Sequence, residues 1–274
     1  MIKKLTLIFL ALIVAATIYE PTNKKIFQSL AKAIFPISGC PDSKFGNTGD
    51  KFFSQFYEDY ILSNIFDEVD KGFYVDVGAN NPNHLNATLY FHKKGWKGMN
   101  FEPQPGFHEI FLKDRSEDIN IQKAVADKIG TATFYVPSAL SPIATLDSKI
   151  KDTSHAATTK EIIVEVTTLT KEFTDHNIHD IDFLKIDVEG FEDKVIAGLD
   201  LQKFRPKVIV LEYISPTQKQ GYLLFEPKLL ENNYILGADD WLNRYYYRKE
   251  NPELGKKFKA IGRCVTLDIL ARSE

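Results

Sequence analysis

Two apolar segments of this chain lead directly into acidic residues and glycine. Residues 73–80 read FYVDVGAN, and residues 184–192 read LKIDVEGFE. In an open α/β sheet, ligands bind in the crevice outside the carboxyl ends of the strands. As strands of one sheet, the two segments therefore predict a binding site in which carboxylates face a ligand.

The first of these strand ends, DVGANN at residues 76–81, is typical of a turn that contacts a nucleoside-type ligand. Gly78 has no Cβ, so the chain can turn tightly and approach another group closely. Asp76 can accept a hydrogen bond from an ammonium group or from N–H groups of the turn. The segment is not a phosphate-binding G-x-G-x-x-G loop, because Asn80 and Pro82 stand where further glycines are needed. A plain β-turn capped by Asp76 is the alternative.

Glu102 closes the next predicted strand, residues 97–101. In Rossmann-like sites, an acidic residue at about this distance from the glycine turn contacts the ribose hydroxyls. One carboxylate can accept hydrogen bonds from two neighbouring hydroxyls. An exposed glutamate before Pro103 is the alternative, and Asp76 upstream favours the binding role.

Three carboxylates follow the second strand, namely Asp187, Glu189 and Glu192. We interpret Asp187 and Glu189 as catalytic, either as a general base for a hydroxyl group or as ligands of a divalent metal ion. The alternative is structural, because negative charge stabilises the N-terminus of a helix. For Glu192 the two interpretations have equal weight. Glu212 also ends a predicted strand and could line the same crevice.

The elements that position these residues alternate between strands and helices. Apolar residues at helical spacing predict helices at residues 53–66, 82–95, 105–115, 191–198 and 225–232. Strands are predicted at residues 72–77, 97–101, 119–124, 131–136, 161–168, 182–186, 207–211, 234–238 and 263–270. This alternation favours a largely parallel sheet between two helical layers, and the long loop before the last strand favours an antiparallel partner there. Residues 137–160 are long enough to form a functional loop or lid, and the run RYYYRK at residues 244–249 is interpreted as a basic, aromatic surface patch.

Several motifs resemble, in order and spacing, the FkbM family of S-adenosylmethionine-dependent methyltransferases. They are Tyr74–Ala79, GWKG at residues 95–98 with Glu102-Pro103, Val166–Leu169, Ile181–Glu192 and Arg205–Glu212. The resemblance covers roughly residues 53–213. It implies the Rossmann-like fold of a class I methyltransferase, a three-layer sandwich around a mostly parallel seven-stranded sheet with an antiparallel last strand.

The resemblance also implies roles for individual residues. The family holds the methionine part of S-adenosylmethionine with the first motif, the ribose with the acidic residue after the second strand, and the adenine near the third strand. The residues implied here are Asp76, Gly78, Ala79 and Asn80 for methionine, Asn81 as the end of the donor segment, Glu102 for ribose and Ala124 for adenine. Asn81-Pro82 departs from members that have a second glycine-containing turn. The implied acceptor is a hydroxyl group of a small molecule or a glycan.

The composition is that of a globular protein, with 44% hydrophobic and 26% charged residues in a chain of 274. A net charge of −3 gives no overall attraction for nucleic acid, so no such partner is expected. Cys40 and Cys264 have neither the spacing of a metal site nor that of a disulfide framework. No metal site is assigned, and a divalent ion near Asp187 stays an open alternative.

We predict a hydrophobic anchor or signal segment at residues 1–20, a linker at residues 21–51 and the methyltransferase domain at residues 52–274. Lys3 and Lys4 precede an uncharged run from Leu5 to Tyr19. The run is shorter than the ~20 apolar residues of a spanning helix and is also typical of a signal peptide. A methyl donor made in the cytosol favours a membrane anchor with a cytosol-facing domain. Export after signal cleavage is the alternative.

The sequence thus predicts an S-adenosylmethionine-dependent O-methyltransferase that acts on a small molecule or a glycan and is attached to the membrane through its N-terminal segment. One alternative is a membrane-tethered, non-catalytic binding protein that has kept the fold. A second alternative, a nicotinamide-dependent oxidoreductase, is disfavoured because the chain lacks a phosphate-binding glycine loop.

Overall fold

The computed structural model describes residues 52–261 except residues 138–140, 155, 216, 218 and 241. The predicted N-terminal segment and linker, both cysteines and the strand predicted at residues 263–270 lie outside the described residues. None of the helices in the described ranges is long and apolar enough to cross a membrane.

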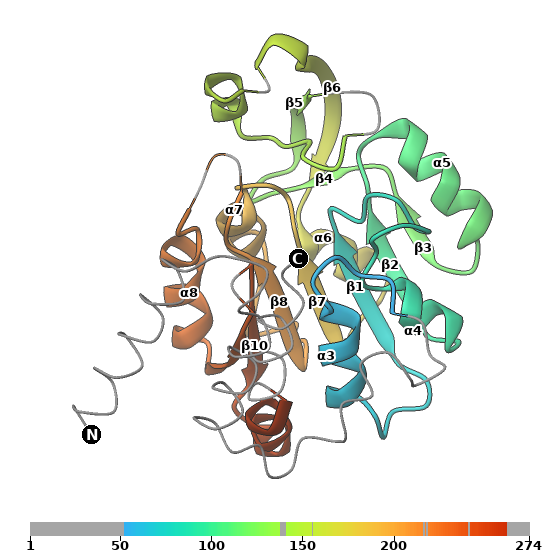
Figure 1. Ribbon diagram of the computed structural model, residues 1–274, viewed down its shortest axis with the longest axis vertical. Helices are drawn as coiled ribbons and strands as arrows, with labels where there is room; N and C mark the ends of the chain where they lie inside the picture. The colour runs from blue at the N-terminus through green and yellow to red at the C-terminus, as the bar shows by residue number, and fades with distance from the viewer. Residues whose placement is uncertain are drawn as a thin grey trace, which may run out of the picture. The chain divides into compact units, whose positions relative to one another are not determined.

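A seven-stranded sheet has the strand order β3-β2-β1-β7-β8-β10-β9 (Figure 1). The strands are β1 (Phe73–Val77), β2 (Lys97–Phe101), β3 (Ile119–Ile121), β7 (Phe183–Ile186), β8 (Val208–Glu212), β9 (Tyr234–Asp239) and β10 (Asn243–Arg248). The pairs from β3 to β8 are parallel, and β10 runs antiparallel to both β8 and β9. The predicted α/β fold, with a mostly parallel sheet and an antiparallel strand at its end, is confirmed.

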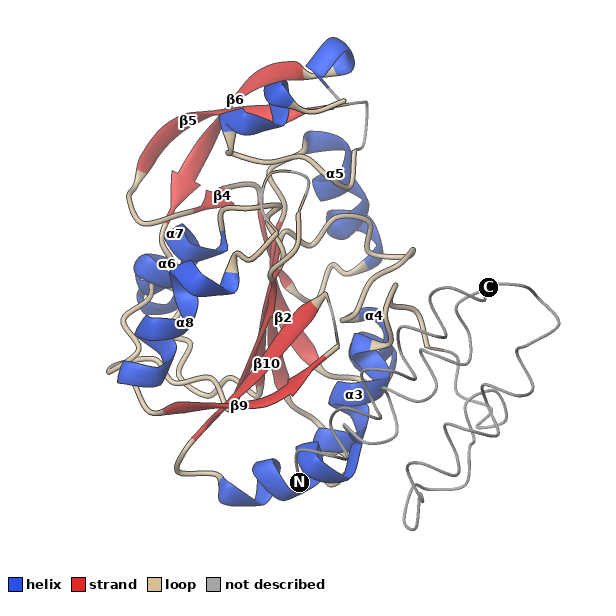
Figure 2. Ribbon diagram, turned by 60° about the vertical axis from the view of Figure 1, so that its left-hand side comes forward, coloured by secondary structure: helices blue, strands red, loops and turns tan. Residues whose placement is uncertain are grey.

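Helices cover both faces of this sheet, as Figure 2 shows. One layer contains α3 (Glu58–Ile65), α4 (Leu89–Lys93) and α5 (Pro105–Asp114), and the other contains α6 (Leu169–Asp175), α7 (Glu192–Ala197) and α8 (Tyr222–Glu231). The predicted three-layer architecture is therefore confirmed. The helix predicted from residue 53 begins later, at Glu58, because the Asp59 carboxylate accepts hydrogen bonds from the N–H groups of Phe53 and Ser54 and holds that segment out of the helix.

The two faces of the sheet have different cores, because successive residues of a strand point to opposite faces. Leu184 belongs to a largely aliphatic cluster that includes Phe173 of α6. On the other face, the Phe183 ring lies 5.9 Å from that of Tyr74 and 4.8 Å from that of Phe91, measured between centroids. Both clusters are buried, so the central strands are held from both sides.

A smaller, three-stranded sheet follows β3 and lies at the top of Figure 1. Its strands are β4 (Ala124–Val125), β5 (Gly130–Val136) and β6 (Lys160–Thr167). The strand predicted at residues 119–124 is thus two strands in different sheets, because β3 pairs with β2 whereas β4 pairs with β6. The predicted loop between β5 and β6 contains two short 3-10 helices, Ser148–Asp152 and Ala156–Thr158.

The interpretation of residues 244–249 as a surface patch was wrong, because they form most of β10. This strand lies between β8 and β9, so both of its edges are paired within the sheet. Tyr245 and Tyr246 are fully buried, and only the ends of the run carry accessible charge. Arg244 is neutralised by ion pairs with Asp239 and Glu226.

Candidate active site

The ends of four adjacent parallel strands bring the predicted site residues into one row. Val77 pairs with Phe101 on one side and with Ile186 on the other, and Ile186 in turn pairs with Leu211. The residues that follow these paired positions are Gly78, Glu102, Asp187 and Glu212. The expectation that both strand ends lie at the same edge of one sheet is met.

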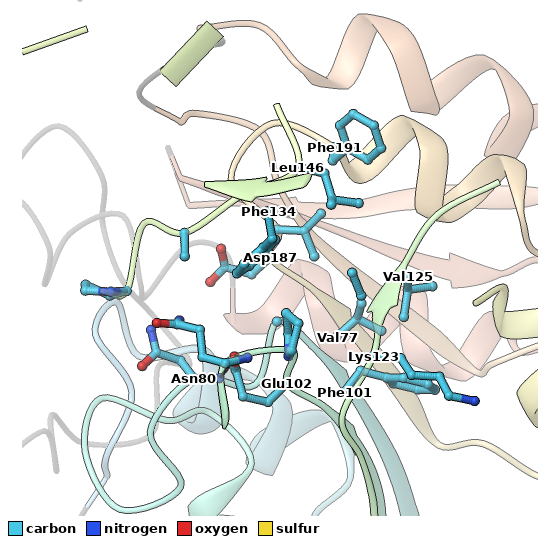
Figure 3. Close-up of a pocket in the computed structure, with 17 residues that line it drawn as sticks. Val77, Asn80, Phe101, Glu102, Lys123, Val125, Phe134, Leu146, Asp187 and Phe191 are labelled. Carbon is cyan, nitrogen blue, oxygen red and sulfur yellow. Dashed lines mark hydrogen bonds between the residues drawn. The ribbon is translucent and has the colours of Figure 1, made fainter. Parts of the chain in front are cut away.

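A cavity opens at this edge, between the strand ends and the small sheet (Figure 3). Asn80 and Glu102 lie on one side of it, Phe134 and Leu146 lie on the other, and Asp187 lies near the middle. Of the predicted site residues, those that line the cavity are Gly78, Asn80, Glu102, Ala124 and Asp187, whereas Asp76, Ala79, Asn81 and Glu189 do not line it. The loop after β5, which we predicted to be a lid, contributes Pro142, Ala144 and Leu146.

The glycine turn packs directly on the end of β7. Gly78 has a φ of +78°, and a Cβ on it would lie 1.9 Å from the carbonyl oxygen of Asp187. The N–H groups of Gly78 and Ala79 both donate to the carbonyl oxygen of Phe101, 3.1 Å away. The close approach predicted for Gly78 is therefore an approach to the backbone of a neighbouring strand, at the floor of the cavity.

Glu102 is buried and tied to the same turn. Its Oε2 accepts a hydrogen bond of 2.8 Å from the N–H of Asn80, and its Oε1 accepts one of 2.7 Å from the N–H of Gln104. Burial raises the pKa of this carboxyl to about 7. A carboxylate oxygen has two lone-pair sites, so each oxygen can still accept a hydrogen bond from a ligand hydroxyl.

Asp76 lies behind the cavity and pairs with a lysine that sequence reasoning missed. Asp76 of β1 is directly opposite Lys185 of β7 in the register of the sheet. The Lys185 ammonium lies 3.8 Å from Oδ1 of Asp76, and the Thr88 hydroxyl donates to Oδ2 at 3.1 Å. Burial raises the pKa of Asp76, and the Lys185 charge opposes that rise.

Lys185 also holds Asp187. Its Nζ donates a hydrogen bond of 3.0 Å to Oδ2 of Asp187. Burial by itself would raise the pKa of Asp187, but the nearby ammonium brings it below its usual value. Asp187 is thus a charged carboxylate at the wall of the cavity, and the ammonium group of Lys185, on the strand that leads into Asp187, holds it in place.

Two further carboxylates surround Asp187. Asp187, Glu189 and Glu212 each offer an oxygen, and these oxygens lie within 4.8 Å of one another. Burial, followed by the Asp187 charge, raises the pKa of Glu189 to about 9 and raises that of Glu212 further. The structure therefore brings the predicted catalytic pair together with Glu212, which was expected to line the same crevice but does not itself line the cavity.

Glu192 has the structural role. Its Oε1 accepts hydrogen bonds from the N–H groups of Val188 and Gly190, at 3.0 and 3.1 Å. This contact closes the turn in which Glu189 has a left-handed φ of +58°. The Thr145 hydroxyl, from the loop after β5, donates to the Val188 and Glu189 carbonyl oxygens from the other side.

Arg115 is a second residue that sequence reasoning missed. Its side chain is buried at the end of α5 and donates to the carbonyl oxygen of Pro82, Oδ1 of Asn86 and Oγ1 of Thr88 at 2.5, 2.9 and 2.7 Å. These contacts hold the segment from Pro82 to Thr88, which follows the turn at Gly78, in place. No sequence signal marks Arg115, whereas Lys185 could have been found from its position two residues before Asp187 on the same strand face.

These features fit a nucleoside ligand. The cavity has apolar walls, such as Phe134 and Val125, beside a buried carboxylate with free acceptor capacity at Glu102. Such a combination of apolar lining with a few fixed polar groups is usual for small-molecule sites.

Comparison with known proteins identifies the family of this chain. A family model described as "Methyltransferase FkbM domain" matches residues 76–249. No curated protein matches the chain. Among solved structures, the chain is similar to an O-methyltransferase from Bacillus cereus in complex with SAH, with 8% sequence identity and a TM-score of 0.34 over 87% of this chain and 97% of that one. Because the family model matches well over half of the sequence, this chain belongs to the FkbM family of S-adenosylmethionine-dependent methyltransferases.

Proposed function

We propose that this methyltransferase transfers its methyl group to a hydroxyl oxygen of a small molecule or a glycan. The observation that carries this proposal is the position of Asp187. Its carboxylate lines the cavity and also belongs to the acidic cluster with Glu189 and Glu212. A hydroxyl group beside Asp187 would therefore be next to both the donor and a proton acceptor.

In this proposal the cavity holds S-adenosylmethionine. Glu102 accepts hydrogen bonds from the ribose hydroxyls, the turn at Gly78 and Asn80 flanks the methionine part, and Ala124 and Phe134 contact the adenine. The bound donor supplies a methyl group on a positively charged sulfur. Carboxylates near this cation favour its binding, because opposite charges attract strongly at short range.

Asp187 takes up the proton of the acceptor hydroxyl. Its pKa lies below the usual value, so it is ionised at neutral pH and able to accept a proton. Fixing the acceptor and donor side by side replaces a collision of two molecules in water, and this supplies much of the rate enhancement. Lys185 and Glu192 are positioning residues, because they hold the side chain of Asp187 and the turn after it.

Two experiments on the full-length protein test this proposal, one of donor binding and one of turnover. Calorimetric titration with S-adenosylhomocysteine is expected to show saturable binding that Glu102→Ala abolishes. Turnover on a panel of hydroxylated sugars and small molecules, followed through S-adenosylhomocysteine release, is expected to be lost in Asp187→Asn while donor binding remains. Asp193→Asn is the matched control, because Asp193 pairs with Lys194 on α7 and belongs to neither the cavity nor the cluster.

Each failure has a separate meaning. Binding without turnover on any acceptor would favour the non-catalytic binding protein. Absence of binding in a folded chain would contradict the donor site. Wild-type turnover by Asp187→Asn would contradict its role as the base.

We further propose that an N-terminal anchor attaches the enzyme to the membrane with its domain in the cytosol. The support is the uncharged run between Leu5 and Tyr19 and the cytosolic origin of the donor. Protease treatment of intact and opened cells tests it. Protection of the domain in intact cells together with recovery in the membrane fraction is expected, whereas a shortened, exported chain would support signal cleavage.

A further inference from the structure

The acidic cluster of Asp187, Glu189 and Glu212 is assembled by two structural features. Asp187 and Glu212 lie side by side because Ile186 and Leu211, which precede them, are paired in register. Glu189 is returned toward them by its left-handed backbone conformation. The result is three oxygens, one from each side chain, within 4.8 Å of one another.

The cluster contains an unsatisfied acceptor. Glu212 is 8% exposed, and its Oε2 accepts no hydrogen bond from any residue in the described part of the chain. A buried polar atom without a partner is costly, and the cost is larger when the group is charged. In native structures such an atom calls for an explanation, such as a catalytic role or a bound water or ion.

Lys185 is not the partner of the Glu212 oxygen. Its ammonium lies against Asp187 and Asp76, on the strand side of the cluster. Within the described ranges, no ion pair involves Glu189 or Glu212. Among the described residues, the ammonium thus pairs with Asp76 and Asp187 and not with Glu189 or Glu212.

We infer that Asp187, Glu189 and Glu212 bind a divalent cation of the Mg²⁺ or Mn²⁺ type. Carboxylate oxygens without nitrogen or sulfur ligands select such hard cations. Mg²⁺ is usually held by few carboxylates and keeps several water molecules. Positions occupied by water would remain open to an acceptor hydroxyl.

This inference rests on the proposed function and supplies a step that it needs. An ordinary carboxylic acid has a pKa of about 4, whereas the pKa of an alcohol hydroxyl lies far above that value. A carboxylate alone is therefore a weak base for this proton. A hydroxyl bound to a divalent cation is far more acidic. Its O–H bond then breaks toward Asp187, its oxygen forms the new bond to the methyl carbon, and the carbon–sulfur bond of the donor breaks with its electron pair left on sulfur.

The test is a titration of the chelator-treated, full-length protein with Mn²⁺, followed by the paramagnetic resonance signal of free Mn²⁺. We expect saturable binding near one equivalent, displaced by Mg²⁺. Glu212→Gln is expected to weaken the binding at least tenfold. Glu172→Gln is the matched control, because Glu172 is also a buried carboxylate but bonds to Thr167 and lies outside the cluster.

Two results would overturn the inference: no saturable Mn²⁺ binding by the folded wild type, or binding that Glu212→Gln leaves unchanged. If Glu212→Gln does not fold, Glu189→Gln, at a half-buried position, is used in its place with the same expected loss. S-adenosylhomocysteine binding is measured on the same samples. Donor binding without Mn²⁺ binding rejects the cation alone, whereas loss of donor binding in the folded wild type rejects the proposed function.

Discussion

Gly78 and the carbonyl oxygen of Asp187 are in direct backbone contact, with no space for a Cβ between them. The contact joins the end of β1, where the proposed donor segment begins, to the end of β7, which carries the proposed base. Any side chain at residue 78 must therefore push apart the two strand ends that form the floor of the cavity.

Gly78→Ala is expected to lower the free energy of unfolding by more than about 3 kcal/mol, because strain at a positive φ adds to the displacement of a neighbouring strand. Gly95→Ala is the control. Gly95 has a φ of +86° but no atom within 4 Å of an added Cβ, so only the strain of about 1 kcal/mol is expected. Urea denaturation measures both variants, and equal losses would show that the contact with Asp187 is unimportant.

Arg115→Met should destabilise the domain by about 3–5 kcal/mol, because each buried acceptor that loses its donor costs about 1–3 kcal/mol. The substitution leaves the carbonyl oxygen of Pro82 and the side chains of Asn86 and Thr88 without their donor. Lys171→Met, which removes a surface ion pair with Asp175, should leave the denaturation midpoint unchanged. A small effect at Arg115 would mean that water replaces the guanidinium.

The affinity for S-adenosylhomocysteine should depend on pH through Glu102. The ionised carboxylate accepts hydrogen bonds from the ribose, and its pKa is about 7. Affinity should therefore be constant above pH 8 and fall as the pH drops, by about tenfold per unit below the pKa. Calorimetric titrations between pH 5.5 and 8.5 test this. Glu102→Gln should bind more weakly with no such dependence, and an equally steep profile in that variant would assign the titration to another group.

Phe134→Ala should weaken donor binding about tenfold, through the loss of aromatic contact area worth ~1–2 kcal/mol. Phe134 is buried against the cavity, whereas Ile163 on the neighbouring strand is 72% exposed. Ile163→Ala therefore tests whether a change in the small sheet alone affects binding. Equal affinities of the two variants for S-adenosylhomocysteine would remove Phe134 from the donor site.

The central strands and the position of the site could be predicted from the sequence for a physical reason. The strands β1, β7 and β8 are buried on both faces, so they appear as mostly apolar runs, in which Asp76 interrupts β1, Lys185 interrupts β7 and an acidic residue ends β8. Parallel pairing then places their carboxyl ends at one edge, and no further information is needed to bring Gly78, Asp187 and Glu212 together.

The partners of the charged residues could not be predicted in the same way. Asp76 appeared to be a ligand-binding residue, but the register of β1 on β7 gives it Lys185 as a neighbour. Register depends on contacts between segments that are distant in sequence. The buried position of Arg115 depends likewise on how α5 packs.

Residues 244–249 were misinterpreted because charge was given more weight than strand propensity. Tyrosine is enriched in strands, and the three consecutive tyrosines were the relevant signal. The position of the small sheet beside the cavity was equally hidden, since it depends on the pairing of Ala124 with Val166.

The strand order of the main sheet has a consequence for synthesis on the ribosome. The backbone N–H of Phe73, at the start of β1, donates to the Asp182 carboxylate 109 residues further along the chain, and Glu58 accepts from Asn243 across 185 residues. Contacts of such high contact order are slow to form, because a long loop must first be closed. Until β7 has emerged, one edge of β1 is unpaired and able to recruit a strand from another chain. We therefore expect the cavity to form late in folding, and nascent chains that stop before residue 182 to aggregate.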